Sequence, residues 1–202
     1  TRWWAGQAGL PWASVTPALL VPIVGNVLVP LAGVPLGQPE WSAAQFGIGL
    51  LFWPVVLALL VVRIATQGMW PERLLPASFI LLAPPAVAGL SAPLLGAPPA
   101  LAWVLWGMAM FSLLWVGRLA QRIVSQPFGL AHWGISFPLA ALTTLTLQLG
   151  QSGPMAWLGV ALLALTSVVV AGLALATVHG LRSGSLLQAE AVPISVAPPG
   201  AG

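Results

Sequence analysis

Six apolar stretches dominate this sequence, and each is close to the roughly 17 to 25 residues that a helix needs to cross a bilayer. Charged residues make up 4% of the chain, against about 25% in an ordinary soluble domain. The sequence therefore predicts an all-α integral membrane protein in a lipid bilayer, and the short links predict three antiparallel hairpins. The expected spans lie at about 16–35, 42–64, 75–93, 99–121, 131–150 and 154–181.

These spans define one predicted transmembrane domain, residues 1–183. The segment 184–202 is rich in Ala, Pro and Gly and has no sustained period, which is typical of a disordered tail. The chain opens at Thr1, without an initiator methionine or the charged start of a signal peptide. We interpret it as a fragment that lacks its true N-terminus.

The arginines orient the spans, because arginine in short loops marks the cytoplasmic side of a membrane. All of them fall on one predicted face, whereas the opposite links hold Glu40 alone. We therefore expect both ends of the chain in the cytoplasm and place the protein in a bacterial inner membrane. No basic cluster of the kind that binds nucleic acid is present. The arginines are Arg2, Arg63, Arg73, Arg118, Arg122 and Arg182.

The sequence offers little for catalysis or for binding a metal or cofactor, and we predict no enzyme. It has no cysteine, and His132 and His179 lack partners at metal-ligand spacing, so we interpret both as interfacial histidines. The segment "GISFP" lacks the second glycine of a nucleophile elbow. Glu72 and Arg73 could form a gating ion pair or a solvated loop pair.

Internal prolines alternate along the spans. The first, third and fifth spans contain them, whereas the second, fourth and sixth consist mostly of Leu, Val, Ala and Trp, with Pro54 as an exception. Lipid cannot satisfy the backbone groups that a broken helix exposes, so kinked spans belong inside protein or beside water. The odd spans are therefore predicted to be inner helices and the even spans outer helices.

Each odd span also has one face of small or weakly polar side chains at steps of three and four residues. Two interpretations remain open: close helix packing, for which small residues are common in membranes, and a water-lined passage. The amides of Asn26 and Gln148 favour the passage, because an amide is costly in lipid unless it is partnered. The predicted pore-lining residues are Pro22, Asn26, Pro30, Pro84, Ala88, Pro138, Ala141, Thr144 and Gln148.

Three segments resemble the fifth, seventh and ninth helices of the tellurite-resistance/dicarboxylate transporter family (TehA-like), whose fold is shared with plant slow-type anion channels. They are "TPALLVPIVGNVLVPLAG" (16–33), "ERLLPASFILLAPPAVAG" (72–89) and "WGISFPLAALT" (133–143). The resemblance implies ten helices in five hairpins, of which this chain has the last three, with kinked inner helices around a pore and often a homotrimer. It also implies that the Phe137 ring plugs the pore where Pro138 bends the helix.

Three functional hypotheses follow. The first is a channel for small anions with a mostly uncharged pore gated by Phe137. The second is a proton-coupled C4-dicarboxylate or sulfite carrier, which the lack of an intramembrane Asp or Glu argues against, although His132 could carry the proton. The third is a non-transporting fragment. The sequence leaves the identity of the anion open.

Overall fold

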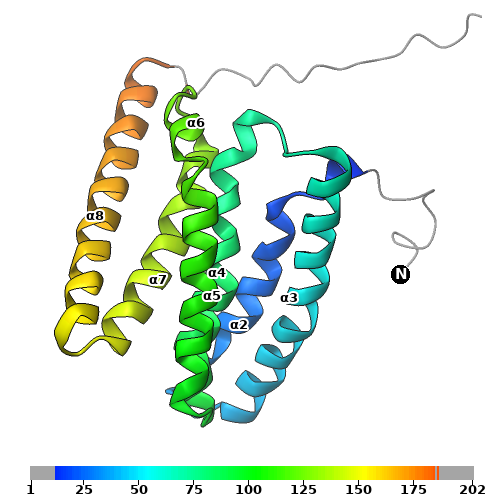
Figure 1. Ribbon diagram of the computed structural model, residues 1–202, viewed down its shortest axis with the longest axis vertical. Helices are drawn as coiled ribbons and strands as arrows, with labels where there is room; N and C mark the ends of the chain where they lie inside the picture. The colour runs from blue at the N-terminus through cyan, green and yellow to red at the C-terminus, as the bar shows by residue number, and fades with distance from the viewer. Residues whose placement is uncertain (1–11, 185, 187–202) are drawn as a thin grey trace, which may run out of the picture.

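The computed structural model describes residues 12–184 and 186, and every regular element in this part is a helix (Figure 1). This result confirms the predicted all-α class. Five helical stretches are long and apolar enough to cross a membrane, and the first predicted span is a shorter apolar helix, Pro17–Gly33. The count of six spans therefore stays a prediction. Most of the predicted tail lies outside the described residues, as does Arg2.

Three hairpins stand side by side in Figure 1, each with one helix running away from the end where α6 lies and one returning to it. The outgoing helices are α2 (Val21–Gly33), α4 (Ala83–Ser91) and α7 (Ser136–Leu149), and the returning helices are α3 (Pro39–Gln67), α5 (Pro99–Gly117) and α8 (Gly153–Arg182). A short helix, α6 (Ala120–Val124), follows α5.

The three hairpin turns use the same residue types. Glycines at positive φ, Gly37 (74°), Gly96 (82°) and Gly153 (68°), reverse the chain in a conformation that other residues rarely adopt. A proline then occupies the first or second position of each returning helix. Proline suits this position because its fixed φ is helical and because an N–H at this position would have no partner within the helix.

Burial separates the central helix from the peripheral ones. In the span Glu72–Leu95, which contains α4, 83% of the most apolar window is buried, compared with 17% in α3 and 22% in α5 and α8. Helix α4 packs against α2, α5 and α7. The span Leu130–Leu149 is intermediate at 39%. The proline pattern thus correctly predicted α4 as an inner helix and α3, α5 and α8 as peripheral ones.

Each outgoing helix begins as a 3-10 helix and continues as an α-helix. The 3-10 segments are η2 (Pro17–Leu20), η3 (Glu72–Leu82) and η5 (Leu130–Ile135), and η4 (Ala92–Leu95) follows α4. Pro22, Pro84 and Pro138 lie within the first three residues of the following α-helix, where a proline breaks no α-helical hydrogen bond. These prolines therefore lie at a change of helix type rather than inside a continuous α-helix, unlike Pro30.

Threonine side chains on α7 connect it to its neighbours. The Thr146 hydroxyl accepts a hydrogen bond from the Trp106 indole of α5 at 3.0 Å, and Thr143 lies 2.8 Å from Thr166 of α8, oxygen to oxygen. All three threonines are buried. Such interhelical bonds contribute about 0.6 kcal/mol on average in a membrane. Two of the polar residues that interrupt this apolar span therefore serve helix packing.

Candidate functional site

The predicted pore-lining residues fall into two sets. The exposed set lies on α2 and α7 and comprises Pro22, Thr144 and Gln148, with Asn26 half-buried. The buried set lies on α2, α4 and α7 and comprises Pro30, Pro84, Ala88, Pro138 and Ala141. Neither set contains a charged side chain. The exposed faces of α2 and α7 thus flank an α4 that is covered on every side.

Phe137 is the second residue of α7 and lies where η5 changes to α-helix. Its side chain is 44% exposed, although the adjacent Pro138 and Leu139 are buried. The Ser136 hydroxyl donates a hydrogen bond to the Trp133 carbonyl at 2.8 Å across the same junction. A large apolar ring therefore projects from the point at which the helix changes its winding.

The polar groups of the two flanking helices are largely satisfied within their own helix. The Asn26 amide donates to the Pro22 carbonyl at 2.8 Å, and the Thr144 hydroxyl donates to the Ala140 carbonyl at 2.9 Å. The Thr144 hydroxyl keeps acceptor capacity only, whereas the Asn26 amide keeps one further N–H donor besides its acceptor oxygen. They provide a weakly polar surface without a fixed charge.

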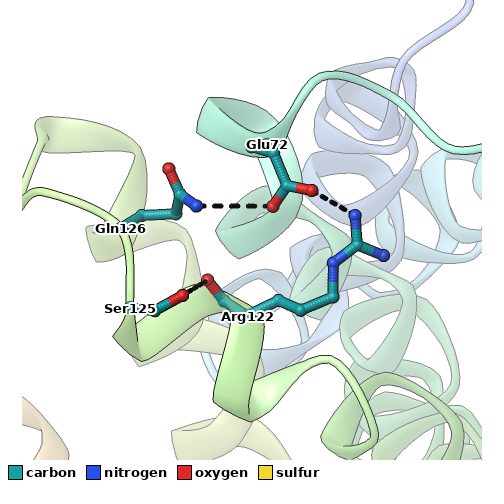
Figure 2. Close-up of polar contacts among 4 residues, drawn as sticks. All are labelled: Glu72, Arg122, Ser125 and Gln126. Carbon is teal, nitrogen blue, oxygen red and sulfur yellow. Dashed lines mark hydrogen bonds and ion pairs between the residues drawn. The ribbon is translucent and has the colours of Figure 1, made fainter.

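The end of the bundle that carries α6 holds an ion pair that joins the start of η3 to α6. The Arg122 guanidinium pairs with the Glu72 carboxylate, and the Gln126 amide approaches the other Glu72 oxygen at 3.5 Å (Figure 2). Glu72 thus pairs with a residue 50 positions away rather than with its neighbour Arg73. The Arg122 and Glu72 side chains are 51% and 45% exposed, so the pair is worth about 1 kcal/mol or less.

Arg63, near the end of α3, was not singled out from the sequence beyond its value for topology. It is 7% exposed, and its Nη1 donates to the Gly68 carbonyl at 2.6 Å while Nε donates to the Trp12 carbonyl at 3.2 Å. The guanidinium also lies 5.8 Å from the centre of the Trp70 ring. Backbone carbonyls and an aromatic face stabilise this buried cation. Its role in the structure is to connect the chain before α2 with the end of α3.

Two apolar grooves lie among the peripheral helices. The larger, about 840 Å³, runs between α3 and α5 over Leu81 and Pro85. The smaller, about 550 Å³, lies between α5 and α8 and includes His132, whose Nδ1 is 3.0 Å from the Gly129 carbonyl. Within the described residues, no three His, Asp or Glu side chains come together as a metal site would need.

Comparison with known proteins gives the family. Residues 1–178 match the family model described as voltage-dependent anion channel, SLAC1. The chain belongs to the SLAC1 family. The match includes every predicted pore-lining residue and Phe137, and it confirms the resemblance to slow-type anion channels.

Two SLAC1-family relatives from Arabidopsis thaliana show how much of a family member this chain represents. The S-type anion channel SLAH2 is 30% identical over 192 residues, which are 93% of this chain and 36% of that protein. The S-type anion channel SLAH1 is 25% identical over 154 residues, which are 74% of this chain and 40% of that protein. The chain thus matches about two fifths of the length of these SLAC1-family channels.

Proposed function

We propose that the protein conducts small anions across a membrane through a mostly uncharged passage beside α2, α4 and α7, with the Phe137 ring as its gate. One observation carries the proposal: in a chain from an anion-channel family, Phe137 is 44% exposed on α7, a helix that packs against the buried α4. A buried ring would have indicated packing. An apolar ring in a narrow passage blocks ions both by its bulk and by excluding water.

The absence of charge along the predicted passage favours rapid flow over tight capture. Conduction requires that an ion enters and also leaves, and a deep arginine or lysine would hold an anion strongly. The buried Arg63 is not among the predicted pore-lining residues, and its guanidinium already donates to two carbonyls. We therefore favour a channel over a carrier, and a trimer is the assembly that we expect by resemblance.

A proton-coupled carrier is the alternative, and the requirement for a proton gradient separates it from a channel. We expect flux through liposomes containing the full-length protein to follow the anion's electrochemical gradient and to persist when the pH gradient alone is collapsed. The reason is that α2, α4 and α7 carry no Asp or Glu to relay a proton. A fluorescent chloride indicator inside the liposomes gives the readout.

His132→Gln is the matched variant for this experiment, because His132 is the side chain that could replace a carboxylate. It lines the smaller peripheral groove and makes backbone contacts at Gly129. We expect its flux to equal that of the unchanged protein. Flux that stops when the pH gradient is removed, or that needs His132, would favour the carrier.

The orientation of the hairpins is testable because the chain has no native cysteine. Ser125 is exposed at the end of the bundle with α6, and Ser152 is exposed at the opposite end, before α8. The arginine distribution predicts that the first end faces the cytoplasm. We expect an impermeant thiol reagent added outside intact cells to label Ser152→Cys and not Ser125→Cys. The reverse labelling pattern would contradict the proposed orientation.

A further inference from the structure

Ser91, the last residue of α4, has an unusual hydroxyl. Its side chain is 0% exposed, and among the buried side-chain oxygen and nitrogen atoms of the described residues, its Oγ alone has no hydrogen-bond partner. A buried polar group without a partner is unfavourable, and native structures keep one where it serves a function or where a water or ion completes it.

Other hydroxyls on the helices make a hydrogen bond that the Ser91 hydroxyl lacks. Nine described Ser and Thr side chains donate to the carbonyl of the residue four positions earlier in the chain. They are Ser42, Thr66, Ser112, Thr143, Thr144, Thr146, Thr166, Ser167 and Thr177. The same bond from Ser91 would reach the Val87 carbonyl in α4. Its donor is instead left free.

The position of Ser91 on α4 puts its unpaired hydroxyl in line with residues that are predicted to line the passage. Steps of four and three residues along α4 place it on one stripe with Pro84 and Ala88, two predicted pore-lining residues. Both of these neighbours are small and apolar, so the Ser91 hydroxyl is the polar group of the stripe. A hydroxyl hydrogen binds an anion, whereas the carbonyl oxygens exposed by kinked helices attract cations.

We propose that the Ser91 hydroxyl is a hydrogen-bond donor to the small monovalent anion that passes along α4. The inference rests on the proposed function and adds a binding residue to it. In this structure Ser91 is covered, so an anion reaches it when the passage is open. The free donor then gains a charged partner, and a single neutral bond holds the anion weakly enough for release.

The test measures chloride binding apart from conduction, in the full-length Phe137→Ala protein with and without Ser91→Ala. Chloride binding to the purified proteins is followed by broadening of the ³⁵Cl NMR line, and chloride currents are recorded in parallel. We expect Ser91→Ala to raise the Kd for chloride, and the chloride concentration for half-maximal current, about tenfold. Surface expression should stay unchanged, because the substitution removes one unpaired oxygen and adds no atom that could clash.

Two further variants strengthen the test. Ser167→Ala removes an exposed α8 hydroxyl that bonds its own Leu163 carbonyl, and we expect no change in either chloride measurement. Ser91→Thr keeps the hydroxyl, and we expect it to retain chloride binding.

The outcomes separate the inference from the proposed function. Equal chloride Kd values with and without the Ser91 hydroxyl would overturn the inference, whether or not current flows. Serine-dependent chloride binding without current would keep the Ser91 site and contradict the channel. Current that is insensitive to Ser91→Ala would keep the channel and reject the site.

Discussion

Phe137→Ala in the full-length protein is expected to raise basal anion conductance about tenfold or more, the factor that corresponds to lowering a barrier by roughly 1.4 kcal/mol. The ring is the bulkiest group on its stripe, next to Ala141 and Thr144, and removing it widens and wets an apolar constriction. Ion preference should change little, since no charge is altered. Currents recorded together with surface expression provide the measurement.

The packing interpretation makes the opposite prediction for the same substitution. Truncating a fully buried phenylalanine costs about 3 to 5 kcal/mol, so the variant would express poorly and conduct no better. A ring that is 44% exposed loses less packing on truncation. Phe111→Ala, on the peripheral helix α5 and 70% exposed, is the control and should leave the current unchanged. A well-expressed Phe137→Ala protein with unaltered conductance would contradict the gate.

Gly49→Ala is expected to separate α2 from α3 and to destabilise the protein by about 1 to 3 kcal/mol. A Cβ at Gly49 would lie 2.6 Å from the Val27 Cγ1 atom and 3.1 Å from both the Ile23 carbonyl oxygen and the Val27 nitrogen of α2. A side chain can rotate away, but two backbone atoms can yield only if the helices move apart. Glycine permits this close approach between membrane helices.

Gly47→Ala is the matched control, in the same helix and two residues away, because a Cβ there would meet nothing within 4 Å. Alanine favours a helix over glycine by about 1 kcal/mol, so this variant should be as stable as the parent or more stable. The melting temperature in detergent should therefore fall for Gly49→Ala and stay the same or rise for Gly47→Ala, by about 2 to 4 °C for each kcal/mol in a chain of this size. Equal melting temperatures would show that α2 and α3 do not pack at Gly49.

The main architecture could be predicted because membrane helices obey strong constraints on length and polarity. The predicted spans 42–64 and 154–181 correspond to α3 and α8, extended by a few residues at their ends. The scarcity of charged side chains and of breaks in these spans makes them easy to recognise. The alternation of prolines likewise predicted that α4 would be an inner helix and that α3, α5 and α8 would be peripheral.

The change from 3-10 to α-helix could not be predicted from the same pattern. Both helix types bury apolar residues at similar spacing, and proline is acceptable in either when it occupies an early turn. We therefore expected bends within helices at Pro22, Pro84 and Pro138, and the structure has junctions there instead.

Contacts between distant residues also escaped prediction. The pairing of Glu72 with Arg122 depends on how η3 and α6 meet, which local spacing does not encode. Arg63 was interpreted through the topology rule, which explains an arginine at that end and not its burial against Trp70. Ser91 lies at helical spacing from two predicted pore-lining residues, Pro84 and Ala88, but its unpaired state depends on a rotamer and on neighbours that the sequence does not specify.

The 3-10 segments also set the length of the central span, Glu72–Leu95, relative to that of the neighbouring helices. A 3-10 helix rises about 2.0 Å per residue and an α-helix about 1.5 Å, so the 24 residues from Glu72 to Leu95 reach about 43 Å, the same as the 29 residues of α3. Rewinding the 11 residues of η3 as α-helix would shorten this span by about 5 Å. Such a shortening would move Glu72, the first residue of η3, away from Arg122. The Glu72–Arg122 ion pair therefore reports whether η3 is wound as a 3-10 helix.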